Sequence, residues 1–77
     1  MARPMKDYHI NIFYRQEDES YVADIPDLKF CSALGETQIE ALAAVIDARD
    51  AWLAAAAERG VAIPEPRYKP VIYQVAG

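Results

Sequence analysis

Apolar and polar side chains alternate near the start of the chain, between Tyr8 and Tyr14. One face would carry Tyr8, Ile10, Ile12 and Tyr14, and the other would carry His9, Asn11 and Phe13. A period of two with β-branched and aromatic residues is typical of a half-buried strand. The polar run over residues 15–20 predicts a turn, and Tyr21–Ile25 predicts a second strand. Because the connection is short, the two strands are expected to form an antiparallel hairpin.

Two further strands are predicted, one on each side of a long helical segment. Pro26 ends the second strand, because proline has no amide hydrogen to donate to a ladder. The short apolar segment Phe30–Leu34 predicts a third strand, which Gly35 ends. Near the other end of the chain, Val71–Val75 alternates again and predicts a fourth strand that begins after Pro70.

The segment between these strands has the features of one long helix. Thr37 and Glu40 match the capping box, in which a hydroxyl and a carboxylate satisfy free amides at a helix start. Alanine, the best helix former, is abundant in the segment, and Gly60 stands where a glycine commonly follows a helix. The helix is therefore expected from about Thr37 to Arg59. Residues at helical spacing predict one apolar face made of Ile39, Leu42, Ala43, Ile46 and Leu53, with Asp50 in the same row.

Together these elements predict an α+β fold with two layers in the order β-β-β-α-β, an antiparallel sheet covered on one face by one long helix. A chain of 77 residues permits a single domain. Residues 1–66 would form this αβ domain, and residues 67–77 a C-terminal extension with the fourth strand and no DNA-binding module. Trp52 shares a helix face with Val45, Ala48 and Ala56 and is expected at the edge of the core. One helix leaves the second sheet face uncovered, and Phe13 would lie there.

The net charge of −4 is unevenly distributed. Residues 7–58 hold eleven of the twelve acidic residues and three basic ones, a net charge of −8. An acidic body repels phosphates, so direct binding of nucleic acid is disfavoured. The same charge would attract a basic protein partner. A surface acidified for solubility is the alternative explanation.

Candidate catalytic and metal-binding residues are few. Glu17, Asp18 and Glu19 cluster on the first predicted turn, but a two-metal nuclease needs several converging carboxylates and the first strand has none. His9 is the only histidine, and Cys31, the only cysteine, lies in an apolar stretch where a buried structural thiol is common. No phosphate-binding glycine loop is present. These features predict a protein that is not an enzyme and that uses no cofactor and no metal.

Several motifs occur in the order found in a known family. Residues 21–28 read Tyr-Val-Ala-Asp-Ile-Pro-Asp-Leu, similar to that family's Tyr-Val-Ala-x-x-Pro-Asp-Leu. Residues 31–37 are similar to its Cys-x-x-x-Gly-Asp/Glu-Thr, and Glu40-Ala41-Leu42, Ala51-Trp52-Leu53 and Ile63-Pro64-Glu65-Pro66 follow. Over residues 8 to about 66, the chain resembles the N-terminal domain of HicB-type antitoxins, which has a reduced RNase H-like fold. Where the family usually has Pro-Gly before the cysteine, this chain has Lys29-Phe30.

The resemblance implies a module that binds and neutralises a small basic mRNA-cleaving toxin of the HicA type. Together with the charge pattern it gives the expected partner-binding residues, Phe13, Glu17, Asp18, Glu19, Tyr21 and Asp24. Many members of the family carry a C-terminal DNA-binding module, which these 77 residues lack. The alternative is a homo-oligomeric orphan domain with a structural or small-ligand role and no toxin partner.

A homodimer or homotetramer is expected, because an apolar terminal strand offers an open edge for pairing. The residues expected to drive this assembly are Val71, Ile72, Tyr73 and Val75. The first six residues lack the apolar stretch of a signal peptide, and Ala51–Ala57 is too short to span a bilayer. A cytoplasmic location without membrane contact is therefore expected.

Overall fold

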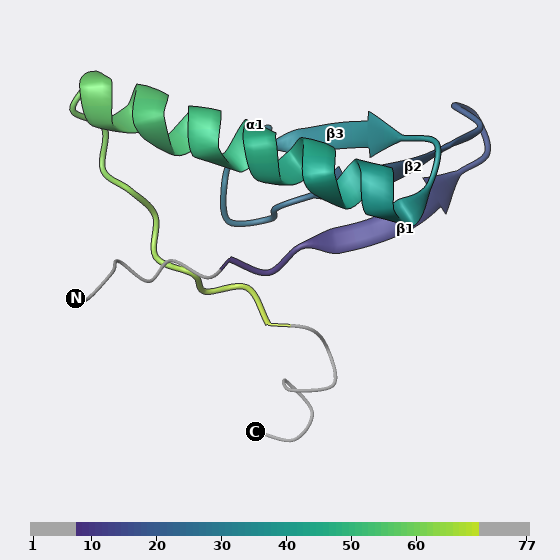
Figure 1. The fold of residues 1–77 in the computed structure, drawn as a ribbon. Coiled ribbons are helices and arrows are strands. Elements are labelled where there is room, and N and C mark those ends of the chain that lie inside the picture. Colours follow the sequence, from purple (N-terminus) through teal and green to yellow (C-terminus); the bar gives the residue numbers. More distant parts are fainter. Residues whose placement is uncertain (1–7, 70–77) are drawn as a thin grey trace.

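The computed structural model describes residues 8–69, which form a three-stranded sheet and one helix. The elements are β1 (Asn11–Arg15), β2 (Ser20–Asp24), β3 (Ser32–Gly35) and α1 (Gln38–Glu58). Figure 1 shows α1 lying across one face of the sheet. The predicted α+β class, its two layers and the order β-β-β-α are thereby confirmed. The predicted fourth strand, Val71–Val75, lies outside the described residues.

The sheet is antiparallel throughout and has the strand order β1-β2-β3. Ile12, Ala23 and Ala33 stand opposite one another across the three strands, and all three pack in or against the core under α1. Successive side chains of a strand point to opposite faces. The next row, Phe13, Val22 and Leu34, therefore points away from the helix, as the alternation in the first strand predicts for Phe13.

The core lies between the sheet and α1. Its largest fully buried side chains are Ile25, Leu28 and Val45. Ile25 and Leu28 come from the loop after β2, which folds back so that the Ile25 amide donates to the Cys31 carbonyl at 3.0 Å. The core is therefore closed at one end by a loop rather than by a strand.

The helix packs on the sheet through a face that shares only Leu53 with the one predicted. Its buried residues are Ala41, Val45 and Ala56, whereas Ile39 of the predicted face is 78% exposed. The face that the sequence assigned to Trp52 is the one that contacts the sheet, and Trp52 itself is half-buried there. Small side chains let the helix axis come close to the strands. An ideal Cβ on Gly35 would lie 2.4 Å from the Ala41 backbone nitrogen, which shows how close β3 and α1 are.

The predicted helix boundaries are confirmed within one residue at each end. Thr37 is the N-cap, and its hydroxyl accepts a hydrogen bond from the Glu40 amide at 3.1 Å. The Glu40 carboxylate accepts at 3.0 Å from the amide of Glu36, one residue before the position that a standard capping box uses. At the other end, Arg59 is the C-cap and Gly60 has a φ of 70°, a conformation that glycine adopts without strain.

The third strand begins later than predicted. Phe30 and Cys31 lie in a turn, where the Cys31 amide donates to the Leu28 carbonyl at 3.1 Å. Phe30 has a φ of 62°, which is left-handed and incompatible with a strand. The sequence also predicted that the strand stops before Gly35. This is wrong, because Gly35 is the last residue of β3 and pairs with Tyr21.

After the helix, an extended segment returns to the beginning of β1 (Figure 1). The Tyr8 hydroxyl donates to the Pro64 carbonyl. The Asp27 carboxylate accepts hydrogen bonds from the amides of Arg67 and Tyr68 at 3.1–3.2 Å. The contacts between this segment and the αβ domain thus continue beyond residue 66.

Candidate functional site

Carboxylates gather at the end of the molecule that carries the β1–β2 hairpin. Glu17, Asp18 and Glu19 occupy its turn and are all exposed. The Arg15 Nε atom lies 3.2 Å from a carboxylate oxygen of Asp18 and 3.7 Å from one of Glu17. Such exposed pairs contribute little to stability. One guanidinium beside three carboxylates leaves the turn with a negative charge.

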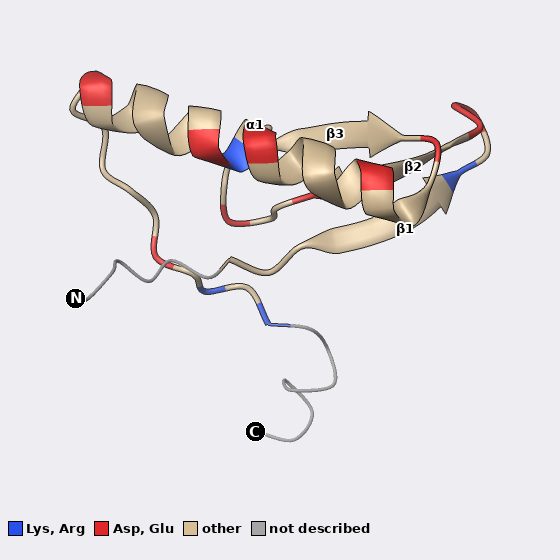
Figure 2. Ribbon diagram, viewed as in Figure 1, with Lys and Arg blue, Asp and Glu red and all other residues tan. Residues whose placement is uncertain are grey.

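Two further carboxylates join this cluster through the sheet and the helix start. Because Tyr21 pairs with Gly35, the next residue of the chain, Glu36, leaves the sheet beside the beginning of β2. Glu40 lies next to Glu36, as the hydrogen bond between them shows. Figure 2 shows acidic residues at the hairpin, at this helix start and along α1. We call the set Glu17, Asp18, Glu19, Glu36 and Glu40 the acidic end.

The sheet face that α1 leaves uncovered adjoins the acidic end. Its apolar row consists of Phe13, Val22 and Leu34, of which Phe13 is 46% and Leu34 55% exposed. Beside this row, the Asn11 side-chain amide donates to the Asp24 carboxylate at 3.5 Å. We call this surface the open face.

The structure brings five of the six predicted partner-binding residues onto these two neighbouring surfaces. Glu17, Asp18 and Glu19 lie at the acidic end, and Phe13 and Asp24 lie on the open face. Tyr21 instead points to the helix side of the sheet, where it packs against the core and against the Tyr14 ring at 5.3 Å. The predicted assembly residues Val71, Ile72, Tyr73 and Val75 lie outside the described residues.

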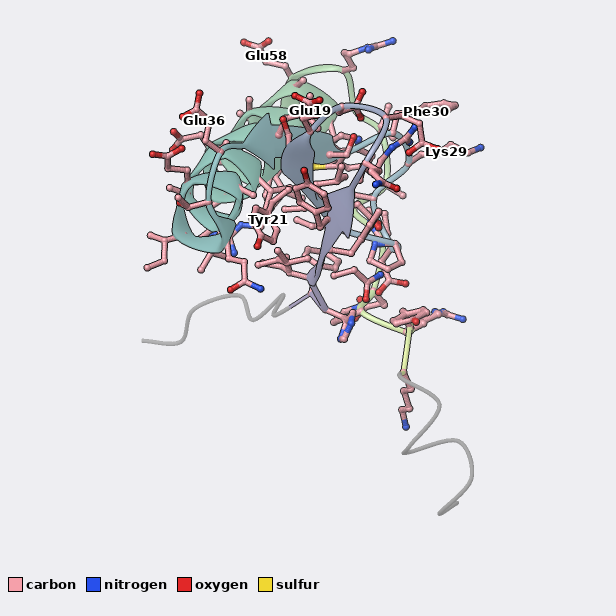
Figure 3. The ribbon with its side chains drawn as sticks, turned by 90° about the vertical axis from the view of Figure 1, so that its right-hand side faces the viewer. Glu19, Tyr21, Lys29, Phe30, Glu36 and Glu58 are labelled. Carbon is pink, nitrogen blue, oxygen red and sulfur yellow. The ribbon has the colours of Figure 1, made fainter. Side chains whose placement is uncertain are left out.

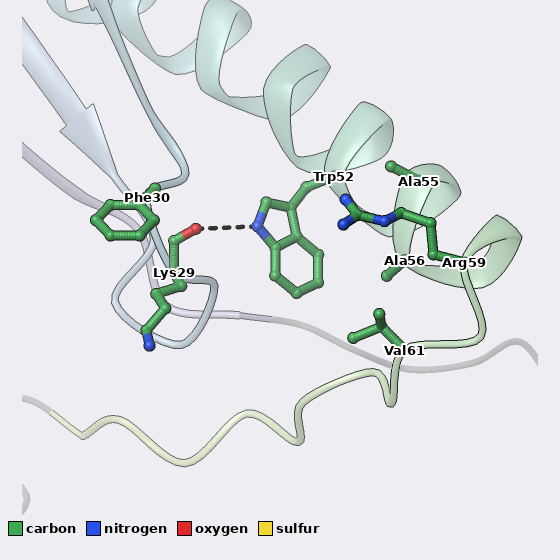
Figure 4. Close-up of a pocket in the computed structure, with 7 residues that line it drawn as sticks. All are labelled: Lys29, Phe30, Trp52, Ala55, Ala56, Arg59 and Val61. Carbon is green, nitrogen blue, oxygen red and sulfur yellow. Dashed lines mark hydrogen bonds between the residues drawn. The ribbon is translucent and has the colours of Figure 1, made fainter.

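A groove at the other end of the domain has no counterpart in the sequence predictions. It has a volume of about 450 Å³ and lies between the β2–β3 loop and the last turns of α1 (Figure 4). Phe30, Trp52 and Val61 supply its large apolar side chains, and Lys29 and Arg59 its charges. The available signal was the Lys29-Phe30 pair at the position where the resembled family has Pro-Gly. Figure 3 shows both residues projecting on the side away from Glu36.

Cys31 and His9, the residues considered for catalysis, have different surroundings and do not form a common site. Cys31 is buried, and burial raises the pKa of its thiol above the ordinary value, with a smaller opposing effect from Arg49 and a smaller reinforcing one from Asp24. A protonated thiol is a weak nucleophile. A ring nitrogen of His9 shares a hydrogen bond of 2.8 Å with the Asn11 side chain, and the His9 ring contacts the Tyr68 ring in a tilted arrangement, with 4.8 Å between the ring centroids. Within residues 8–69, no three His, Cys, Asp or Glu side chains converge as metal ligands.

In the part of the chain that the structure covers, no helix has both the length and the apolar composition needed to cross a bilayer. Comparisons of the chain with protein-family models, with curated proteins and with solved structures found no match. Arguments about function therefore depend on the surfaces described above.

Proposed function

We propose that this chain is an antitoxin-type module that binds and neutralises a small basic mRNA-cleaving toxin of the HicA type. The observation that carries the proposal is the position of the acidic end beside the exposed Phe13 and Leu34 of the open face. In this role the chain would have no catalytic activity and would need no metal or cofactor. It also places the protein in the cytoplasm, where its RNA-cleaving partner would act.

The two surfaces would act in different ways. Carboxylates at the rim of an interface mainly accelerate encounter with an oppositely charged protein. Exposed aromatic side chains supply the anchor that slows dissociation, because they bury a large apolar area in a pocket of the partner. Phe13 is the aromatic anchor of the open face, and Leu34 lies on the same row two strands away.

The first test is to look for a small basic protein in the neighbouring reading frames and to titrate it with this chain by calorimetry. We expect saturable binding of the unmodified chain and loss of at least about tenfold in affinity for Phe13→Asp. The matched control is Phe30→Asp, because Phe30 is a more exposed phenylalanine that lies at the other end of the domain. Equal affinities of the two variants would place the interface elsewhere. The absence of any small basic neighbour would favour the alternative below.

The alternative is a homo-oligomeric domain without a toxin partner. Among the described residues, β1 and β3 each have one edge that no other strand pairs. The fourth strand proposed for Val71–Val75 would supply an apolar partner for such an edge, in its own chain or in a second copy. Light scattering of the full chain and of a chain without residues 70–77 tests this. A molar mass that falls on truncation supports assembly through this segment, whereas an unchanged mass contradicts it.

A further inference from the structure

Phe30 combines an unfavourable backbone conformation with almost complete exposure. Its φ of 62° belongs to the left-handed region, which glycine adopts freely and which a bulky residue adopts only at a cost. Its side chain is 95% exposed, more than that of any other large hydrophobic residue in the described part of the chain. Packing inside the domain therefore does not compensate for the strain. An exposed aromatic held in a strained conformation indicates a functional role.

The groove beside Phe30 is held open by contacts within the domain. The Trp52 indole nitrogen donates to the Lys29 carbonyl at 3.0 Å, which ties the β2–β3 loop to α1 and fixes the indole plane. Figure 4 shows the Phe30 ring on one side of this carbonyl and the indole on the other. The volume of about 450 Å³ is in the range of small-ligand sites, and the lining is mainly apolar.

Two cations line the same groove. Lys29 and Arg59 form no ion pair with any residue between Tyr8 and Lys69. Both are therefore available to an anionic group, and the guanidinium can bind a carboxylate with two parallel hydrogen bonds. The charge here is opposite to that of the acidic end, so a basic partner would not select this surface.

We propose that the groove binds an acidic peptide segment of a second protein partner, in which an aromatic or large aliphatic side chain is flanked by carboxylates. The apolar side chain packs in the groove against Trp52 and Val61, with the Phe30 ring at its rim, and the flanking carboxylates reach Lys29 and Arg59. A nucleic acid is disfavoured as the occupant, because it carries one negative charge per nucleotide and the body of this protein is acidic. The site lies away from the acidic end, so it can be occupied while a basic partner is bound there.

Trp52 is the only tryptophan of the chain, so its fluorescence and its indole N–H resonance report directly on the groove. The probe is a capped peptide with one phenylalanine flanked by two aspartates and a glutamate. We expect a saturable shift of both Trp52 signals, and binding that weakens as salt is raised. A counterpart with lysines in place of the acids should bind at least about tenfold more weakly.

Two variants connect the binding to the proposed residues. Phe30→Gly relieves the backbone strain and removes the ring, so affinity should fall at least about tenfold while the thermal midpoint does not decrease. Phe13→Ala on the open face is the matched control and should bind the peptide as the unmodified chain does. Lys29→Glu combined with Arg59→Glu should reverse the preference toward the lysine peptide.

Several results would overturn the proposal. They are no saturable Trp52 shift with the acidic peptide at millimolar concentration, equal binding of the acidic and lysine peptides, or full binding by Phe30→Gly. If adenosine monophosphate bound more tightly than the acidic peptide, the occupant of the groove would be a nucleotide and not a peptide. A Trp52 signal that changes with protein concentration, without added peptide, would show that the groove binds a second copy of this chain instead of a peptide. None of these results bears on toxin binding at the acidic end, which calorimetry with the basic protein measures separately.

Discussion

The end of β3 and the first turn of α1 approach each other closely at Gly35, so Gly35→Ala tests how α1 docks on the sheet. An added Cβ would lie 2.4 Å from the Ala41 nitrogen, 2.7 Å from the Glu40 carbonyl carbon and 2.8 Å from the Ala41 Cα. All three atoms belong to the backbone, so no change of side-chain rotamer can relieve the contact. The start of α1 or the end of β3 has to move.

The cost of that movement can be estimated from the packing around it. Ordinary contact between carbon atoms is about 3.5–4.0 Å, so a shift of about 1 Å is needed. Overpacking of this kind typically costs about 1–3 kcal/mol. The shift also loosens the contacts of Ala41 and Val45, which are fully buried under the sheet. We expect a loss of about 2–4 kcal/mol, which lowers the thermal midpoint of a domain this size by about 10–25 °C.

The assay is thermal and urea unfolding followed by circular dichroism, with Gly60→Ala as the matched control. A Cβ at Gly60 would have no atom within 4 Å, so the control tests only the left-handed φ of 70°. That conformation costs a non-glycine residue about 1–2 kcal/mol. A Gly35→Ala variant as stable as the unmodified chain, or more stable than Gly60→Ala, would refute the close docking of α1 on β3.

Further predictions concern the helix cap, the buried cysteine and the hairpin carboxylates. Thr37→Ala removes the hydroxyl that caps α1 and should reduce the free energy of unfolding by about 1 kcal/mol, measured by urea titration, whereas Thr37→Ser should restore most of it. Because burial raises the pKa of Cys31, its reaction with a thiol reagent at pH 8 should be much slower in the folded chain than in urea. The neutral thiol is favoured by folding, so its contribution to stability is complete below about pH 8.5 and is lost as the pH rises beyond that through the raised pKa, which unfolding at a series of pH values would show. Replacing the three hairpin carboxylates by glutamine should slow association with a basic partner at low salt and leave dissociation nearly unchanged, and an unaltered association rate would contradict the steering role of Glu17, Asp18 and Glu19.

The elements of this fold could be predicted because each has a strong local signal. Alternation gave the first hairpin, and Thr37 and Gly60 gave both ends of the helix. The buried face of the helix could not be predicted in this way. An alanine-rich helix presents two apolar faces, and Ile39, which belongs to the predicted face, is exposed. Local patterning does not distinguish the two faces; they differ in tertiary contacts, such as the close approach of Ala41 to Gly35.

In the candidate surfaces, too, the features set by local patterns could be predicted and those set by tertiary contacts could not. Phe13 could be placed on the uncovered face because strand alternation fixes it, but Tyr21 was assigned to the partner surface although its alternation puts it on the helix side. For the groove, the sequence offers only the Lys29-Phe30 pair as a signal. The groove itself depends on the turn at Phe30 and on the hydrogen bond from Trp52 to Lys29, which joins residues 23 positions apart.

The central claim is that this chain neutralises a small basic mRNA-cleaving toxin. The proposal expects a small basic protein in a neighbouring reading frame, and the most direct measurement is the rate of RNA cleavage by that protein as the purified chain is added in increasing amounts. The proposal predicts that cleavage falls in proportion to the added chain and stops at a fixed stoichiometric ratio, and that Phe13→Asp requires a large excess. Cleavage that continues unchanged with the chain in excess, under conditions where the toxin is active, would contradict it.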